Sequence, residues 1–147
     1  MSEATGETRT YANVHDLVDH AELVDIRFYE VAASRTDSDE SRHSIQVVSR
    51  VELAEIEIRC RAAVDGGGAQ YKVDAGAVFT LAPPGAVVPE IVREFTEKVG
   101  VMAVYPYVRS AVSNLGAQLG VDRPTLPLLR FGSIRLDEQG TSSESPV

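Results

Sequence analysis

The chain has little of the side-chain chemistry that catalysis or metal binding requires. Its 147 residues contain no tryptophan, three histidines and a single cysteine, Cys60. The histidines lack both a neighbouring cysteine and a His-Glu-x-x-His spacing, so no metal site is predicted. No Gly-x-Ser-x-Gly elbow and no complete phosphate loop is present, and one cysteine cannot form an internal disulfide bond. We therefore expect a protein that is not an enzyme and that needs no cofactor.

Basic residues are also scarce. Fourteen Lys and Arg stand against twenty-two Asp and Glu, which gives a formal net charge of -8 and a pI near 4.8. Nucleic-acid phosphates would be repelled, and the basic stripe that binds them is missing, so no nucleic-acid partner is expected. The negative charge suits a basic docking partner or cationic segments of a bound chain, or it serves solubility alone.

No long apolar run is present. The most apolar window, Ala75 to Val88, is interrupted by glycine and proline and is far shorter than the roughly 20 residues of a membrane helix. The opening residues 1–7 have neither the basic start nor the apolar centre of a signal peptide. These observations predict a cytoplasmic protein that does not insert into a membrane.

The composition and length fit one globular domain. Apolar residues make up 44% and charged residues 24% of the chain, which are ordinary values for a folded soluble protein. Residues 1–10 and 137–147 are polar and aperiodic, which predicts flexible tails. Residues 11–136 are left as the single predicted domain.

Alternation of apolar and polar residues predicts an antiparallel sheet of four strands. Asn13 is a plausible cap for a short first helix, after which strands are expected within 23–33 and 45–50. The alternation is clearest over 55–64 and 69–81, where one face is apolar and the other charged. Between residues 23 and 33 the alternation changes phase, which indicates a bulge or burial on both sides.

The last two predicted strands form a hairpin. A turn at residues 65–68, which contains three glycines, would place Val64 opposite Ala69 and Arg59 opposite Asp74. The Arg59–Asp74 pair would be a favourable cross-strand contact on the charged face. Both apolar sets would then lie on the other side of the sheet and need a cover.

Helical spacing supplies that cover. One helix is expected from Pro89, interrupted at Gly100, and a second from near Pro106 to Leu119, ended by Gly120. The second helix would be roughly 22 Å long, enough to lie across a small sheet. The predicted fold class is therefore α+β, a four-stranded antiparallel sheet covered on one face by a long C-terminal helix.

An extended apolar segment follows the helix. Pro124 and Pro127 prevent a helix between Arg123 and Phe131, although the segment carries several large apolar side chains. These side chains either close the core of one subunit or line a groove or subunit contact. On the charged face of the sheet, Glu55 and Glu57 are followed by arginines, which favours a solvated or partner-facing surface over an acid–base pair.

The helix and the segment after it resemble the SecB family of export chaperones. Tyr105-Pro106-Tyr107-Val108-Arg109, followed by Ser113-Asn114-Leu115, is similar to the aromatic-Pro-Tyr-x-Arg start of that family's helix. Leu126-Pro127-Leu128 resembles its crossover loop. The family has a four-stranded antiparallel sheet, a long helix, this loop and a final helix. After Phe131 the sequence has too few apolar residues for that final helix, and in this it looks more like the SecB-like relatives, some of which serve toxin–antitoxin pairs.

The resemblance implies a homotetramer, a dimer of dimers, that holds unfolded polypeptides in apolar grooves without ATP. It implies a role in protein export or as a dedicated antitoxin chaperone. On this likeness Glu55 and Glu57 are candidates for docking the SecA motor. The predicted polypeptide-binding residues are Phe79, Tyr105, Tyr107, Leu126, Leu128, Leu129 and Phe131.

Two alternatives remain open from the residues alone. One is a small-molecule-binding α+β domain or an enzyme, with a pocket between sheet and helix lined by Tyr71, Tyr105 and Tyr107. The other is a structural interaction domain with one fixed partner. The absence of a convergent set of acid, base and nucleophile favours binding over catalysis.

Overall fold

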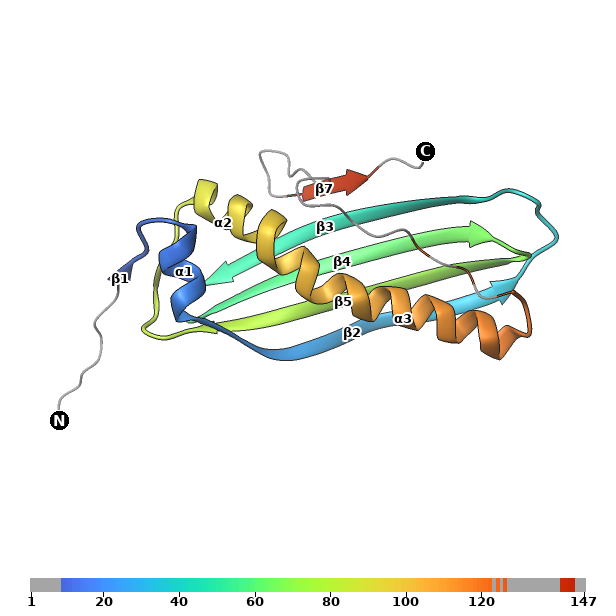
Figure 1. Cartoon of the computed structure of the whole chain (residues 1–147), viewed down its shortest axis with the longest axis horizontal. Coiled ribbons are helices and arrows are strands. Elements are labelled where there is room, and N and C mark those ends of the chain that lie inside the picture. The colour runs from blue at the N-terminus through green and yellow to red at the C-terminus, as the bar shows by residue number, and fades with distance from the viewer. Residues whose placement is uncertain (1–8, 123, 125, 127–140, 145–147) are drawn as a thin grey trace.

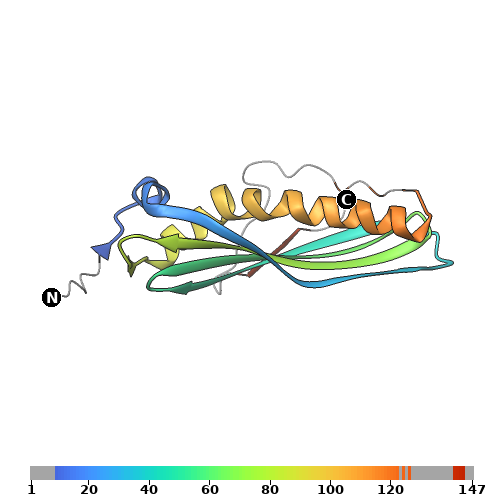
Figure 2. The ribbon, with the colours of Figure 1, turned by 90° about the horizontal axis from the view of Figure 1, so that it is seen from below.

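Four long strands and one short strand form a twisted antiparallel sheet with a helix lying along one face (Figures 1 and 2). The computed structural model describes residues 9–122, 124, 126 and 141–144. The predicted fold class, a four-stranded antiparallel sheet covered on one face by a long helix, is confirmed. The strands, in their order across the sheet, are β2 (Ala21–Arg35), β5 (Ala69–Leu81), β4 (Glu55–Gly66), β3 (Arg42–Glu52) and β7 (Thr141–Glu144).

Small elements close one end of the sheet. Strand β1 (Arg9–Thr10) pairs in parallel with β6 (Gly85–Ala86), so the predicted N-terminal tail includes one short strand. Helix α1 (Val14–His20) follows, and the side chain of its N-cap Asn13 accepts a hydrogen bond from the Asp16 backbone N–H at 2.8 Å. The predicted cap is therefore confirmed, because this bond satisfies one of the free N–H groups at the helix start.

Strand β2 contains two bulges. Its pairing with β5 skips one residue between Leu23 and Asp25 and another between Phe28 and Glu30. The extra residues are Val24 and Tyr29. Each bulge shifts the alternation of side chains by one residue, which explains the phase change in the sequence and confirms the predicted irregularity.

The β4–β5 hairpin has a tighter turn than the sequence suggested. The strands pair through Gly66, and the turn is formed by Gly67 and Gly68 with φ of 64° and 86°. Two successive positive φ values are the geometry that glycine adopts without steric cost, and they suit a two-residue hairpin turn. The predicted register is wrong by two residues: Val64 lies opposite Tyr71 rather than Ala69. Because the error is even, the apolar set stays on one face.

The corrected register changes the charged face. Asp74 lies directly opposite Arg61 rather than Arg59. Both arginines nevertheless reach this carboxylate, Arg59 with Nη2 at 2.6 Å and Arg61 with Nε at 3.2 Å. The expected Arg59–Asp74 contact is thus a diagonal one, which long side chains can make across neighbouring strands.

The two predicted helices are one continuous helical segment. It consists of α2 (Pro89–Phe95), a π-helical turn η1 (Thr96–Gly100) and α3 (Val101–Leu119), with Pro106 in the interior of α3. The predicted interruption at Gly100 is wrong, because this glycine has ordinary helical dihedrals. A Cβ there would lie 2.5 Å from Cγ1 of Ile58, so glycine permits close approach of the helix to β4. The predicted end is confirmed, since Gly120 adopts a left-handed conformation with φ 74°.

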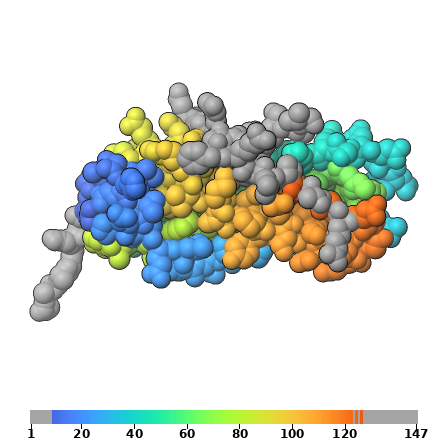
Figure 3. Space-filling view, viewed as in Figure 1, coloured from blue at the N-terminus to red at the C-terminus, as the bar shows by residue number. Residues whose placement is uncertain are grey.

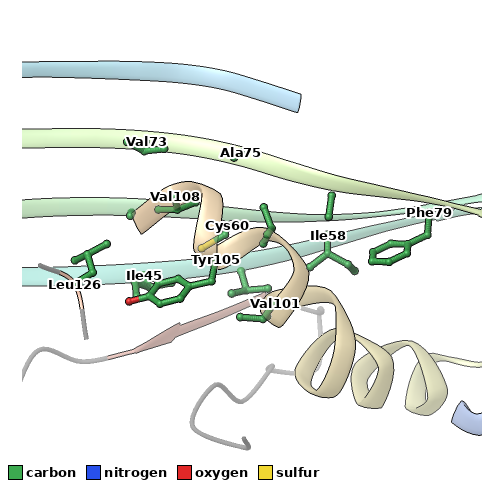
Figure 4. Packing of buried hydrophobic residues seen from close by; sticks show 14 of the residues in the cluster. Ile45, Ile58, Cys60, Val73, Ala75, Phe79, Val101, Tyr105, Val108 and Leu126 are labelled. Atoms are coloured by element: carbon green, nitrogen blue, oxygen red, sulfur yellow. The ribbon is translucent and has the colours of Figure 1, made fainter. Parts of the chain in front are cut away.

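The core lies between this helical segment and the apolar face of the sheet (Figure 4). Cys60 is fully buried in it, as expected for a small side chain on the apolar face. Near the α2 end, Phe79 and Phe95 pack edge to face with ring centroids 5.0 Å apart. Fully buried members from sheet and helix include Ile45, Val47, Ile56, Ile58, Val101, Val104, Val108 and Val112.

Candidate functional site

The four predicted polypeptide-binding residues that the structure describes do not lie on one surface. Phe79 belongs to the buried core beside Phe95, whereas Leu126 lies toward the opposite end of α3 (Figure 4). Tyr105 is buried, while Tyr107 is 46% exposed. Residues two apart in a helix point to different sides, so the two tyrosines of the motif face different surroundings. The other three predicted residues, Leu128, Leu129 and Phe131, lie outside the described residues.

Tyr105 and Leu126 are brought together by Arg109, the arginine of the aromatic-Pro-Tyr-x-Arg motif. Its Nε donates a hydrogen bond to the Leu126 carbonyl oxygen at 3.2 Å, and its guanidinium lies 6.0 Å from the centroid of the Tyr105 ring. The motif therefore fixes the start of the segment that follows the helix. Sequence reasoning quoted Arg109 as part of the motif but gave it no role.

Shallow cavities flank Leu126 on both sides. One, of about 300 Å³, opens between α3 and the Leu126 segment. The other, of about 220 Å³, lies between that segment and the β4–β5 turn. The first is lined by Pro106, Arg109, Ser110, Ser113, Pro124 and Leu126.

An apolar surface that the sequence analysis missed lies along β2. Among the described residues no strand pairs with the outer side of β2, and this strand forms the rim of the molecule beside α3 (Figure 3). Five large apolar side chains of β2 are exposed, with Phe28 and Val31 each at 47%. The signal was the phase change between residues 23 and 33, which already placed apolar side chains on both faces. The five are Leu23, Val24, Phe28, Tyr29 and Val31.

Register divides these five side chains between the two faces of β2. Phe28 and Val31 pair with Ala75 and Val73 of β5, and residues directly opposite each other share a face. Leu23, opposite Phe79, joins them on the face that α3 covers. This helix-side set is an apolar strip on an edge strand without an outer neighbour in the described part of the chain, a combination that soluble proteins rarely leave uncovered.

The candidate docking carboxylates lie on the opposite face and share one arginine. Nη2 of Arg50 contacts Glu55 at 2.7 Å and Glu57 at 3.0 Å. Hydrogen bonds to Glu55, and then to Glu57, raise the pKa of Arg50 above its ordinary value. The Glu57 side chain is only 3% exposed and also accepts a hydrogen bond from the Tyr29 hydroxyl. Glu57 is therefore held inside an ion network, while Glu55 is the more accessible of the two.

Tyr29 connects this network to the edge strand. The guanidinium of Arg59 stacks over its ring at 3.9 Å from the centroid, a favourable cation–π geometry. Gly76 makes the arrangement possible, because a Cβ at that position would collide with the Glu57 carboxylate. The charged face of the sheet is thus an ordered array of ion pairs rather than a set of free charges.

Two further observations bear on the kind of site. Within the described residues, no three His, Cys, Asp or Glu side chains gather closely enough to coordinate a metal ion. None of the helices in the described part of the chain has the length and apolar character needed to cross a membrane.

Comparisons with known proteins identify a curated relative and a solved structure of similar fold. No protein-family model matches the chain. The chain is 49% identical to the SecB-like chaperone SmegB of Mycolicibacterium smegmatis over an alignment of 136 residues. This alignment covers 92% of this chain and 93% of that protein. Its fold is similar to that of the SecB-like chaperone Rv1957 of Mycobacterium tuberculosis, solved in complex with a ChAD peptide from the Rv1956 HigA1 antitoxin. The TM-score is 0.65 at 17% identity, covering 77% of this chain and 93% of the other. The resemblance carried by the helix motif is confirmed, and the chain belongs to the SecB-like chaperones.

Proposed function

We propose that this SecB-like chaperone holds incompletely folded polypeptides by burying their apolar segments, and that its dedicated client is an antitoxin. The observation that carries the proposal is the 49% identity, over 92% of the chain, to a SecB-like chaperone. The antitoxin is favoured because the SecB-like protein of similar fold was solved with a peptide from one. Protein export through the SecA motor is the alternative client pathway.

Passive burial explains how such binding would work. Each fully buried apolar side chain of a client contributes about 1.5 to 3 kcal/mol. Ordering an unfolded segment offsets much of that gain, so two or three side chains per site give weak, sequence-tolerant binding. Several such sites on one particle would bind a long client more tightly, since the later contacts are intramolecular. The formal charge of -8 would keep such a particle soluble and favour basic client segments.

The expected homo-oligomer would be built on β2. Strand β2 is fifteen residues long, has no outer neighbour among the described residues and exposes Phe28 and Val31. A second copy of the same strand fits this edge, because a two-fold axis would pair the outward backbone groups and cover both apolar strips. Pairing of this kind produces one continuous sheet from two subunits. A dimer of dimers, as the family resemblance implies, would follow from stacking two such units.

We infer that the protein acts by binding in the cytoplasm rather than by catalysis. Tyr71 and Tyr105, which the small-molecule alternative placed around a pocket, are buried members of the packed core. That packing supports a binding surface over an enclosed active site. If export is the pathway, docking of the motor would engage Glu55 directly and Glu57 only after its contacts with Arg50 and Tyr29 open.

The test combines assembly with client protection. We expect native mass measurements to give a multiple of the 15.9 kDa chain, and we expect the protein to suppress aggregation of a chemically denatured enzyme without ATP. A monomer that suppresses no aggregation would contradict the proposal. To separate the pathways, the affinity for the antitoxin would be compared with that for the isolated SecA motor. Binding to the motor alone would move the protein to export.

A further inference from the structure

Strand β7 covers one edge of the sheet with the chain's own C-terminal residues. It pairs antiparallel with β3, with Ser142 opposite Val47 and Glu144 opposite Ile45. In Figure 1 the short strand (red) lies beside β3, separated along the sequence from the rest of the sheet. The β3 edge therefore accepts an extended segment through backbone hydrogen bonds.

The sequence of β7 is poorly suited to hold that position permanently. Its four residues are Thr-Ser-Ser-Glu, without a single apolar side chain to bury. Strands are stabilised mainly by side-chain packing between neighbours, and serine and glutamate contribute little of it. By contrast β2, β4 and β5 each run for twelve residues or more. What the structure describes of β7 is backbone pairing over four residues, which an extended segment of another chain would also offer.

The covered edge lies beside the cluster around Tyr105. Ile45 and Val47 of β3 are fully buried and belong to the same core cluster as Tyr105 and Leu126. Figure 4 shows Ile45, Tyr105 and Leu126 on the side of α3 that faces the β7 ribbon. A strand added to β3 would place every second side chain on the face of Ile45 and Val47, next to this apolar cluster.

We propose that the β3 edge over Ile45–Val48 binds an extended client segment as an added strand, and that β7 is an internal occupant which the client displaces. This inference rests on the proposed function, since it names where and in what conformation a client binds. A client, rather than a second copy, fits this edge because its occupant is short, polar and tethered. The longer apolar edge at β2 is the one suited to a permanent partner.

Competition from β7 has a measurable consequence. If β7 pairs with β3 nine-tenths of the time, the apparent Kd for a client segment is about tenfold weaker than for an open edge. Removing β7 should therefore tighten binding. A site independent of this edge would show no such dependence.

The first experiment compares two truncations. One ends at Gly140 and removes β7; the matched control ends at Glu144 and keeps it. The probe is a fluorescein-labelled peptide of alternating valine and threonine with a lysine at each end, and its binding is followed by anisotropy. We expect the chain ending at Gly140 to bind about tenfold more tightly than the full chain, and the control to match the full chain. Equal affinity of all three would overturn the proposal.

A second probe tests the binding mode. A version of the peptide methylated at every backbone amide keeps its side chains but has no donor for a sheet edge. We expect it to lose binding to the chain ending at Gly140. If the methylated peptide bound as tightly as the parent, the contact would be through side chains alone and the added-strand mechanism would be wrong.

Hydrogen exchange keeps this inference separate from the proposed function. Removing β7 should speed exchange of the outward backbone amides of residues 45–48, and the valine–threonine peptide should slow it again. The full chain could suppress aggregation while the truncation at Gly140 changes neither the affinity for the peptide nor the hydrogen exchange. That result would contradict the edge proposal and leave the proposed function intact. A chain that suppresses no aggregation, yet binds the peptide more tightly without β7, would support the edge and refute the chaperone role.

Discussion

The two edges of the sheet carry opposite solutions to the same physical problem. Unpaired N–H and C=O groups make any strand edge a template for another chain. The β3 edge is covered by a short polar strand from the same chain, whereas β2 has no neighbour on its outer side among the described residues. The uncovered edge is also the apolar one, with Phe28 and Val31 half exposed. The contrast supports the proposal that β2, with its exposed apolar side chains, pairs with a second copy of the chain.

The largest effect is expected from charging the β2 edge. A double variant would replace Phe28 and Val31 by aspartate. In a two-fold dimer both subunits carry the change, so four carboxylates would be buried at the interface without partners. We expect the oligomer to weaken by about 100-fold or more, equivalent to about 2.7 kcal/mol. Sedimentation velocity over a dilution series measures this. Leu53→Asp is the matched control, because Leu53 is equally apolar and 59% exposed but lies outside β2; equal dissociation by both variants would refute the special role of this edge.

A substitution in the core between the helix and the sheet should lower the stability of the whole fold and affect both sheet edges alike. Gly100→Ala forces a Cβ against Ile58, and overpacking of this kind costs about 1 to 3 kcal/mol. Urea unfolding followed by circular dichroism gives the value. In an Ile58→Ala background the same glycine substitution should cost less, because the γ atoms it meets are gone. A cost that is unchanged in that background would show that the close approach does not constrain residue 100.

The hydrogen bond between Tyr29 of β2 and Glu57 of the charged face can be removed by deleting one oxygen atom. Tyr29→Phe removes the hydroxyl that donates to the buried carboxylate of Glu57, and leaving a buried acceptor short of a partner costs about 1 to 3 kcal/mol. We expect the lower end of that range, because Arg50 still contacts the carboxylate. Thermal unfolding of Tyr29→Phe, compared with Tyr107→Phe on the exposed side of α3, provides the measurement. No difference between these variants would show that the Tyr29 hydroxyl is dispensable.

The smallest change in global stability is expected at the β3 edge. Ser142→Pro with Ser143→Pro removes the backbone donors in the centre of β7, and one of the two necessarily faces β3. A short terminal strand contributes little to the folded state, so the free energy of unfolding should change by about 0.5 kcal/mol or less. Urea unfolding of the double variant checks this. A loss of several kcal/mol would make β7 a structural strand and remove the contrast between the edges.

The parts of the fold that depend on side-chain pattern were predictable. The apolar alternation over residues 55–64 and 69–81 identified two strands and their shared face, and the Asn13 cap and Gly120 stop bounded helices correctly. The register between these two strands was not predictable, because alternation has a period of two and does not distinguish pairings that differ by two residues. Only the turn length, set by Gly67 and Gly68, fixes it.

The remaining misses have separate physical causes. Gly100 was interpreted as a helix breaker, although its role is to let the helix approach Ile58, which no local pattern reveals. Strand β7 has no apolar alternation, so pairing through the backbone alone left no trace in its sequence. The structure joins Tyr105 of the helix motif to Leu126 of the following segment through Arg109, and their role in polypeptide binding stays a prediction. The phase change in β2 was noticed, but its meaning as an exposed surface required the strand order.

The two bulges of β2 have a consequence for how this chain tolerates insertions and deletions. Val24 and Tyr29 are each one residue surplus to the pairing with β5. Losing either one would close its bulge and leave every other residue of β2 opposite its present partner on β5, so Leu23, Phe28 and Val31 would stay on the helix side. Point substitutions can exchange one apolar residue for another along β2 with little effect. An insertion or deletion among the paired residues between Ala21 and Arg35, by contrast, would shift the alternation by one and turn neighbouring side chains to the opposite face.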